Sequence, residues 1–376
     1  MKKSPFLILF FTLIFFSLAL PGAWTTERLS NMSGISIFPA IAVSGSNVYV
    51  AWTNDTTGNN EIYFKRSTDN GATWKDSKQL TTSGTSMNLA IAASGSSVYV
   101  AWFEGDTGNN EIYFKRSTDS GATWKAAKRL TSNSGDSRYP AIAASGSNVY
   151  VAWEDDSPGD FEIHFRRSAD NGATWLTAKK LTNNLGSSTS LAIAASGSNV
   201  CVTWQDMNPG NEEVYFRRSA DNGATWLTAK RLTNNLAVSG NPDMAASGSN
   251  VQVIWQDDRL GAEDDEIHYR QSTDNGAIWL ANKRLTTNTV DSQYPAIAVN
   301  GSNVCAVWQE EFPADYRIYC KRSTDGGASW GYNTRLTYYA NPCTYPDVAV
   351  SASKIYVVWS YGAYGDSNIY MAYSPL

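Results

Sequence analysis

Short segments rich in apolar residues recur along the whole chain, and clusters of Gly, Ser, Asn and Asp separate them. Apolar segments of about four to eight residues bounded by turn residues are typical of β-strands. In one representative stretch the pattern predicts strands at 140–143, 148–153, 162–167 and 175–182. We therefore expect an all-β chain of short antiparallel strands.

Two sequence blocks repeat at a regular spacing, which is typical of repeat architectures. The first has the form S-x-D-x-G-x-x-W and occurs at residues 67–74, 117–124, 168–175, 219–226, 272–279 and 323–330. The second, of the type N-V-Y-V-A-W, ends at Trp52, Trp102, Trp153, Trp204, Trp255, Trp308 and Trp359. Successive tryptophans of the second block are 50 to 53 residues apart, so the chain contains seven similar units.

Four antiparallel strands in each of seven units describe a seven-bladed β-propeller. No unit can bury both of its faces alone, so the ring must close. The last unit ends before a fourth strand, and residues 27–30 (E-R-L-S) resemble the K-R-L-T at 230–233 that ends another unit. We predict that this N-terminal strand completes the last blade, which removes an open sheet edge. Residues 24–376 then form a single domain.

The first 23 residues have the pattern of a secretory signal peptide. Residues 1–3 (M-K-K) precede an apolar run at 6–20, and Ala23 offers a small residue for cleavage. The apolar run is shorter than the roughly 20 residues of a membrane-spanning helix. We predict a secreted or cell-surface protein that is not inserted in a membrane once the leader is removed.

The charge balance bears on the class of partner. The chain has 30 basic and 35 acidic residues, and loss of Lys2 and Lys3 with the leader leaves 28 against 35, a net charge of −7. Proteins that bind nucleic acids need a basic surface to neutralise phosphates, so we expect no nucleic-acid partner. The 14 tryptophans suggest no separate binding platform, because seven end the second block, six end the first and the last is Trp24.

The S-x-D-x-G-x-x-W block resembles the Asp-box, or BNR repeat, of sialidases and related propellers. Its Asp can accept backbone N–H bonds in a turn, its Gly can take a positive φ and its Trp can pin the turn. In that family the box joins the third and fourth strands of a blade, on the face opposite the binding site. The resemblance implies a structural role for Asp69, Asp119, Asp170, Asp221, Asp274 and Asp325.

The same resemblance implies that function lies on the other face, in loops between the second and third strands and between blades. These loops contain acidic residues in every unit, which would favour cations or neutral sugars over anions, although acidic loops also serve solubility. Aromatic rings there can stack on sugars while polar groups bind hydroxyls. The candidate ligand-binding residues are Tyr139, Glu154, Asp206, Asp257, Asp258, Glu310 and Glu311.

A catalytic alternative follows from the resemblance to sialidases. Those enzymes hold the substrate carboxylate with three arginines and use an acidic residue as acid/base and a tyrosine as nucleophile. On the loop face, the arginines that do not recur between units are Arg138, Arg259 and Arg317. The corresponding acid candidates are Asp155 and Asp156, and the nucleophile candidates are Tyr316 and Tyr361.

Recognition is nevertheless the favoured function. Arg138 and Arg317 fall in units three and six of a seven-membered ring, acidic loops oppose an anionic sugar, and enzymatic sialidases of this family have six blades. The chain therefore resembles non-enzymatic BNR-repeat proteins more than true sialidases. We expect a monomeric module that binds a glycan or an extracellular protein; the alternatives are an exo-sialidase-type glycoside hydrolase and a surface-layer or adhesion module.

Cys305 and Cys320 occupy positions at which sister units carry an aromatic pair on neighbouring strands, such as Tyr49 and Phe64. In an exported chain this substitution predicts a disulfide between them. The other two cysteines, Cys201 and Cys343, are expected to be unpaired.

No Cys or His spacing suggests a zinc site, and we expect no resident cofactor. One acidic run leaves a Ca²⁺ site open as an alternative, although it lacks the residue order of a known calcium loop. That run contains Asp257, Asp258, Glu263, Asp264, Asp265 and Glu266.

Overall fold

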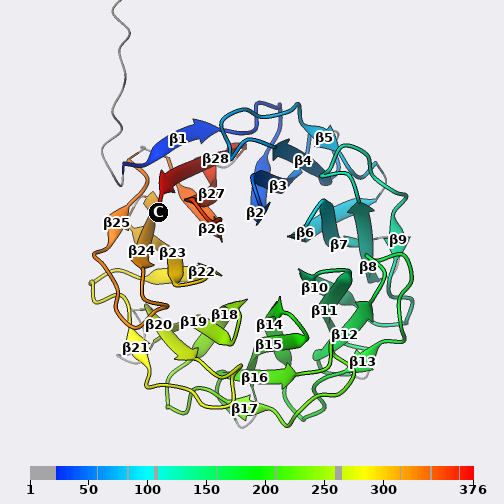
Figure 1. Cartoon of the computed structure of the whole chain (residues 1–376), viewed down its shortest axis with the longest axis vertical. Helices are drawn as coiled ribbons and strands as arrows, with labels where there is room; N and C mark the ends of the chain where they lie inside the picture. The colour runs from blue at the N-terminus through cyan, green and yellow to red at the C-terminus, as the bar shows by residue number, and fades with distance from the viewer. Residues whose placement is uncertain are drawn as a thin grey trace, which may run out of the picture.

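The computed structural model describes residues 23–56, 58–82, 84–105, 109–157, 159–207, 210–258, 265–313, 315–338, 341–363 and 365–376. Within them, strands β1 to β28 form seven four-stranded antiparallel sheets arranged as blades around a central axis (Figure 1). The predicted all-β, seven-bladed propeller is confirmed. Apart from Ala23, the predicted signal peptide lies outside the described residues. No helix of the described part is long and apolar enough to cross a membrane.

Each blade runs outward from an innermost strand beside the axis (Figure 1). The innermost strands are β2 (Ser36–Ser44), β6 (Thr85–Ser94), β10 (Ser137–Ser145), β14 (Ser188–Ser196), β18 (Ser239–Ser247), β22 (Ser292–Asn300) and β26 (Cys343–Val350). The second strands are β3 (Asn47–Asn54), β7 (Ser97–Gly105), β11 (Asn148–Asp155), β15 (Asn199–Asp206), β19 (Asn250–Asp257), β23 (Asn303–Phe312) and β27 (Lys354–Ala363). The third strands are β4 (Glu61–Ser67), β8 (Asn110–Ser117), β12 (Glu162–Ser168), β16 (Glu213–Ser219), β20 (Glu266–Ser272), β24 (Asp315–Ser323) and β28 (Asp366–Pro375). The outermost strands are β5 (Lys78–Gln79), β9 (Lys128–Arg129), β13 (Lys179–Lys180), β17 (Lys230–Arg231), β21 (Lys283–Arg284), β25 (Thr334–Arg335) and β1 (Thr25–Arg28).

The two ends of the chain meet in the last blade, whose strand order is β1-β28-β27-β26. β1 pairs antiparallel with β28, with Thr25 opposite Tyr373. Arg28 Nη2 donates a hydrogen bond to Asn368 Oδ1 at 2.7 Å, and Leu29 beside it is buried. The predicted closure of the ring by the N-terminal strand is confirmed.

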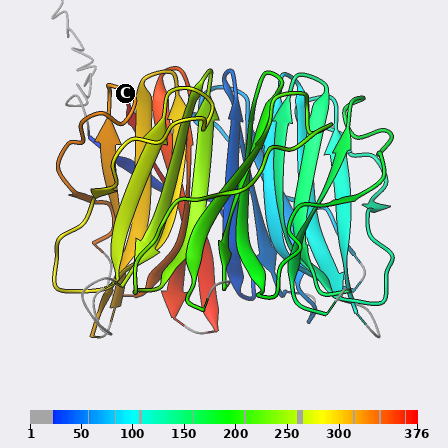
Figure 2. The ribbon, with the colours of Figure 1, turned by 90° about the horizontal axis from the view of Figure 1, so that it is seen from below.

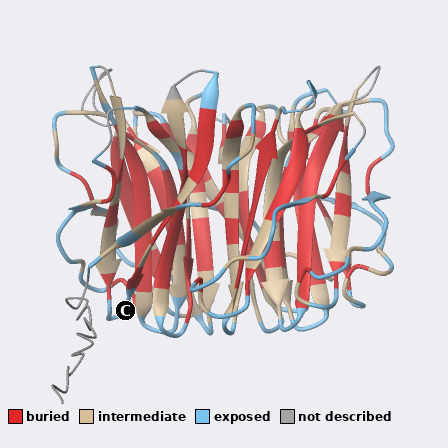
Figure 3. Ribbon diagram, turned by 90° about the horizontal axis from the view of Figure 1, so that it is seen from above, coloured by how far each residue is buried: buried red, intermediate tan, exposed pale blue. Residues whose placement is uncertain are grey.

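The hydrophobic core lies between neighbouring blades. Tyr150 and Phe165 of the third blade, for example, pack with Val202 and Trp204 of the fourth. The middle parts of the inner strands are buried, as the red bands in Figure 3 show, and the second strands are buried on both faces. Burial on both faces explains why the second block is a nearly continuous apolar run rather than an alternating one. Each blade therefore depends on its two neighbours for its core.

The Asp-box turns join the third strands to the outermost ones, at the opposite end of the blades from the loops between second and third strands (Figure 2). In the third blade, Ser168 Oγ and the Thr174 N–H both donate to Asp170 Oδ1, at 2.7 and 2.8 Å. These bonds lower the pKa of Asp170. Trp175 packs edge-on against Phe114 of the preceding blade, with ring centroids 4.9 Å apart. The Ser and backbone bonds recur at Asp69, Asp119, Asp221, Asp274 and Asp325.

Candidate functional site

Every innermost strand has a β-bulge near its start, on the face that carries the loops between second and third strands. The pairing register shifts between Ile37 and Ala40, Met87 and Ala90, Arg138 and Ala141, Thr189 and Ala192, Gly240 and Asp243, Gln293 and Ala296, and Thr344 and Asp347. Each bulge contains one non-glycine residue with φ between 45° and 54°. These residues are Phe38, Asn88, Tyr139, Ser190, Asn241, Tyr294 and Tyr345.

A positive φ costs a non-glycine residue about 1 kcal/mol, and it is rare for a bulky one. A bulge also re-aims the side chain that it carries relative to a regular strand. The backbone of the bulge is the same in all seven blades, whereas its side chain is an aromatic ring in four blades, Asn in two and Ser in one. The scaffold thus presents seven variable side chains around the axis.

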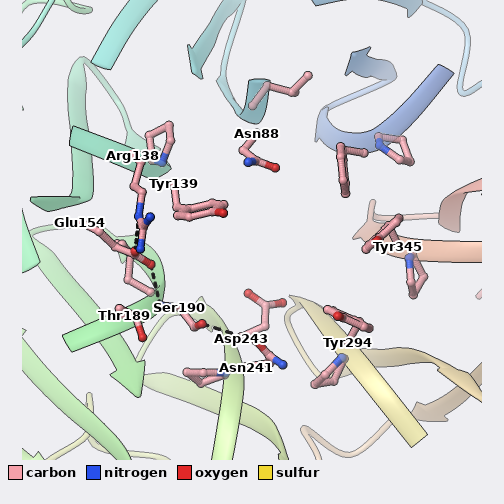
Figure 4. A pocket seen from close by; sticks show the side chains of 18 residues that line it. Asn88, Arg138, Tyr139, Glu154, Thr189, Ser190, Asn241, Asp243, Tyr294 and Tyr345 are labelled. Carbon is pink, nitrogen blue, oxygen red and sulfur yellow. Dashed lines mark hydrogen bonds and ion pairs between the residues drawn. The ribbon is translucent and has the colours of Figure 1, made fainter. Parts of the chain in front are cut away.

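These side chains surround a hollow of about 680 Å³ at the centre of this face, here called the mouth pocket (Figure 4). Its wall consists of the seven bulge residues, the residue that follows each of them, and Arg138, Glu154, Thr189 and Asp243. A hollow of this size is in the range of small-ligand sites. Three residues singled out from the sequence, Arg138, Tyr139 and Glu154, meet in it.

Aromatic rings cover two sides of the mouth pocket. On one side, the ring centroid of Tyr345 lies 4.5 Å from that of Phe38 and 5.5 Å from that of Tyr294. Tyr139 lies on the other side, 5.8 Å from Phe103 (Figure 4). Tyr139, Tyr294 and Tyr345 are 45%, 43% and 36% exposed. These side chains are therefore partly accessible to a ligand.

Arg138 and Glu154 form an ion pair on the wall. Arg138 Nε donates to Glu154 Oε2 at 3.4 Å, and the guanidinium lies 3.7 Å from the ring centroid of Phe161. Glu154 is buried and also accepts the backbone N–H of Ser190 at 2.7 Å. Burial raises the pKa of Glu154 to about 7, although the bonds from Ser190 and Arg138 oppose the rise. The charge of Arg138 is thus directed into the wall.

Two of the innermost strands carry an aspartate directly after the bulge. Asp243 Oδ2 accepts the backbone N–H of Ile297 in the next blade at 2.7 Å, and Asp347 Oδ2 accepts that of Ile41 at 2.8 Å. Burial raises the pKa of Asp243 to about 7, with a further rise from the nearby charge of Asp347, whose own pKa is raised to about 6 by burial. The five sister positions are Ala40, Ala90, Ala141, Ala192 and Ala296.

Sequence reasoning missed these two residues, although a signal for them exists. Asp243 and Asp347 stand out as soon as the innermost strands of the seven units are aligned, because every other unit has Ala there. Neither residue lies in a loop between strands. Asp243 lines the mouth pocket and points into it (Figure 4).

Four acidic residues predicted to face a ligand or to act in catalysis form hydrogen bonds with the scaffold. Asp155, Asp206 and Asp257 end their second strands, and Glu310 lies two residues before the end of β23. All four are buried and do not line the mouth pocket. Each accepts the indole N–H of the tryptophan two residues earlier, at 3.0 to 3.1 Å. They tie the ends of the second strands to the buried tryptophans.

Asp156 and Asp258 likewise hold loops in place. Asp156 Oδ1 accepts the backbone N–H of Asp136, and Asp258 Oδ1 accepts that of Val238, both at 2.6 Å. Neither residue lines the mouth pocket. These bonds fix the inter-blade loop beside each aspartate. The acid role of Asp156 and the ligand-binding role of Asp258 stay predictions.

The structure does not assemble the expected arginine clamp in its described residues. Arg317 Nε donates to Asp315 Oδ2 at 3.0 Å, and the guanidinium lies 3.9 Å from the ring centroid of Phe312. Arg317 does not line the mouth pocket, and Arg259 lies outside the described residues. Among the arginines of the described part, Arg138 alone lines the pocket.

The two nucleophile candidates also lie outside the pocket wall. Tyr316 faces Glu311 across the β23–β24 hairpin, where burial and the hydrogen bond with Glu311 raise its pKa. Glu311 is exposed on this hairpin. Tyr361 packs edge-on against Tyr370, with ring centroids 4.9 Å apart. A raised pKa makes Tyr316 a weaker nucleophile at neutral pH.

The acidic run proposed for Ca²⁺ is divided among other partners. Asp257 binds Trp255, Glu266 forms an ion pair with Arg284, and Asp265 Oδ2 accepts a bond from Gln293 at 3.2 Å. No group of His, Cys, Asp and Glu in the described part of the chain could hold a metal ion. Glu263 and Asp264, which also belong to this acidic run, lie outside the described residues.

Cys305 and Cys320 are free, buried thiols in the structure, so the predicted disulfide is not present in it. Cys305 lies opposite Arg322 rather than Cys320, which makes the two cysteines diagonal neighbours. Diagonal cross-strand residues are about 7–8 Å apart, beyond the usual span of a disulfide. A hydrogen bond with Cys320 and burial raise the pKa of the Cys305 thiol. Cys201 and Cys343 are also free.

No family model matches the sequence, and no curated protein matches it. Solved structures match the fold. An ulvan lyase of polysaccharide lyase family 25, bound to GlcA(1-4)Rha3S, superposes with a TM-score of 0.65 at 10% identity, over 91% of this chain and 95% of that one. The phage phi92 endosialidase gives 0.59 at 8% identity, over 94% and 69% of the two chains. Trypanosoma rangeli sialidase gives 0.53 at 14% identity, over 79% and 56%. The chain therefore has the fold of the sialidase-like propellers.

Proposed function

We propose that this protein is a recognition module that binds a saccharide in the mouth pocket. One observation carries the proposal: seven strained bulges hold four aromatic side chains around an accessible hollow of about 680 Å³. Backbone strain of this kind persists only where the surrounding fold imposes it, and it is concentrated at functional sites. Exposed aromatic faces around a concavity suit the apolar faces of sugar rings.

The polar side chains of the wall complement these rings. Asn88 and Asn241 offer amide groups and Thr189 and Ser190 offer hydroxyls at the same level of the pocket. Amides and hydroxyls both donate and accept hydrogen bonds, as sugar hydroxyls require. The superposed ulvan lyase, whose structure contains a bound saccharide, supports a saccharide ligand for a propeller of this shape.

Binding without turnover agrees best with the chemistry of the wall. Arg138 is engaged by Glu154, and Arg317 is engaged by Asp315 away from the pocket. A sialidase-type reaction needs free arginines to hold the substrate carboxylate and a tyrosine that loses its proton readily. Glycoside hydrolysis is therefore the second candidate, and a structural role as a surface-layer or adhesion module is the third.

The leader sequence at residues 1–23 supports export, so the proposed site of action is outside the cell or at its surface, with a monomeric propeller as the binding unit. Saccharides and extracellular proteins are the partners available there.

A glycan array probed with the mature chain, residues 24–376, tests the proposal. We expect saccharide binding that Tyr345→Ala reduces about tenfold or more, because that ring contacts both other aromatic groups on its side of the pocket. Tyr332→Ala is the matched control, since Tyr332 is 96% exposed and does not line the pocket. A fluorogenic sialoside assayed in parallel should show no turnover. Turnover abolished by Arg138→Ala would establish hydrolysis instead.

A further inference from the structure

Asp243 occupies an unusual place in the repeat. It follows the bulge on an innermost strand, where five of the seven blades carry Ala. Its side chain points into the mouth pocket, between Asn241 and Tyr294 in Figure 4. Asp347 occupies the same repeat position in the last blade but does not line the pocket.

The fold does not need a carboxylate at this position. Asp243 Oδ2 accepts the N–H of Ile297, which ties two neighbouring innermost strands together. Five blades nevertheless pack against their neighbours with Ala at the equivalent position. Burying a carboxylate carries a desolvation cost, which the hydrogen bonds from the Ile297 and Met244 N–H groups oppose. Of the two aspartates at this repeat position, Asp243 alone lines the mouth pocket, where its carboxylate can meet a ligand.

The surroundings of Asp243 favour a positively charged ligand group. The exposed faces of Tyr294 and Tyr345 line the same hollow, and an ammonium group is attracted to aromatic faces as well as to a carboxylate. Arg138, the one arginine on the described wall, forms an ion pair with Glu154 and is stacked on the ring of Phe161. The whole chain is acidic, with a net charge of −5.

A negatively charged sugar meets the opposite conditions. Its carboxylate or sulfate would face Asp243 across the pocket. On Arg138, Nε is already used by Glu154, and the guanidinium is stacked on the ring of Phe161.

We propose that Asp243 and the neighbouring tyrosines form a subsite for an ammonium group, so that the saccharide bound in the mouth pocket is an amino sugar with a free amine. This inference rests on the proposed function and names its ligand class. The carboxylate binds the ammonium group, and the rings of Tyr294 and Tyr345 cover its adjoining C–H surface.

The test is a calorimetric titration of the mature chain near pH 7 with a glucosamine tetramer and with its N-acetylated counterpart, which has no charge. The glucosamine tetramer should bind about tenfold more tightly. Asp243→Ala, which installs the residue of the sister blades, should remove this preference, so that the two tetramers bind with equal affinity. Asp347→Ala is the matched control and should keep the preference. Thermal unfolding of each variant checks that it is folded.

Two results overturn the inference: equal affinity for the two tetramers, or a preference that survives in folded Asp243→Ala. If neither tetramer binds while another saccharide on the array binds through Tyr345, the amino-sugar inference is wrong and the proposed function stands. If no saccharide binds at all, the proposed function itself fails.

Discussion

The two faces of the propeller use aspartate in opposite ways. In the Asp-box turns, each carboxylate accepts bonds from its own turn, as Asp170 does from Ser168 and Thr174, and its pKa is lowered. Beside the mouth pocket, burial raises the pKa of Asp243 and of Glu154 to about 7. The box carboxylates stabilise the fold through their charge, whereas the fold disfavours the charge of the pocket carboxylates.

This difference distinguishes the structural positions of each repeat from the positions that line the mouth pocket. The box turns repeat in both backbone and side chains, because each turn fixes a blade to its neighbour. The bulges repeat only in backbone, and their side chains vary from Phe to Ser. A repeat protein can thus keep one strained backbone seven times over and place a different side chain on it in each blade.

The largest expected loss of stability comes from a substitution on the face that carries the Asp-box turns. Gly172 has a φ of 78°, and a Cβ added there would lie 2.5 Å from Phe114 Cζ in the core. Gly172→Ala should therefore lower the free energy of unfolding by about 3 kcal/mol, through the left-handed backbone and the clash together. Gly146→Ala is the matched control, because its φ is 59° but its Cβ would meet nothing within 4 Å. It should cost only about 1 kcal/mol.

Urea unfolding followed by tryptophan fluorescence measures both variants. Equal losses would show that the packing of the box glycine against the preceding blade contributes nothing to stability.

A substitution at the mouth pocket should have a smaller effect on the free energy of unfolding and should increase it. The raised pKa of Asp243 means that the folded state holds this proton more tightly than the unfolded state does, so the wild type loses stability as pH rises from about 4 to about 7. Asp243→Asn keeps an acceptor for Ile297 and never ionises. It should be more stable than the wild type by about 1–2 kcal/mol at pH 8, and the gain should vanish near pH 4.

Asp170→Asn should change stability at pH 8 in the opposite direction to Asp243→Asn. The lowered pKa of Asp170 means that its charge contributes stability above the unfolded pKa and that this contribution is lost as the pH falls through the folded one. The variant should be less stable than the wild type at pH 8. Urea titrations at the two pH values measure both variants, and a loss of stability in Asp243→Asn at pH 8 would contradict the assignment.

The smallest expected effect concerns a bulge. Asn88 and Asn241 hold the same backbone conformation as Tyr294, and Asn tolerates a positive φ better than Tyr does. The free energy of unfolding of Tyr294→Asn should therefore lie within about 0.5 kcal/mol of the wild-type value, while its saccharide affinity should fall. Thermal unfolding and calorimetric titration measure the two quantities. A large loss of stability would mean that the ring is a structural element rather than a ligand contact.

The repeat carries nearly all information about the fold and much less about the site. Spacing of the tryptophans predicted seven blades, and the unfinished last unit predicted closure by the N-terminal strand. Loop composition misled the assignment of Asp155, Asp206, Asp257 and Glu310, because an acid two residues after a strand-ending tryptophan looks exposed in sequence and is buried in space. The positive φ angles of the bulges depend on three-dimensional packing. The prolines that follow bulge residues in the sequence, such as Pro39 and Pro140, do not predict them.

Hydrogen exchange of the mature chain with and without a saccharide found on the array tests the central claim most directly. The amides of the bulges and of the strands that follow them, at 36–41, 137–142, 292–297 and 343–348, should exchange more slowly when the saccharide is bound. The box turns at 67–74, 117–124 and 168–175 should not change. Slower exchange at the box turns, or none at the bulges, would contradict recognition at the mouth pocket.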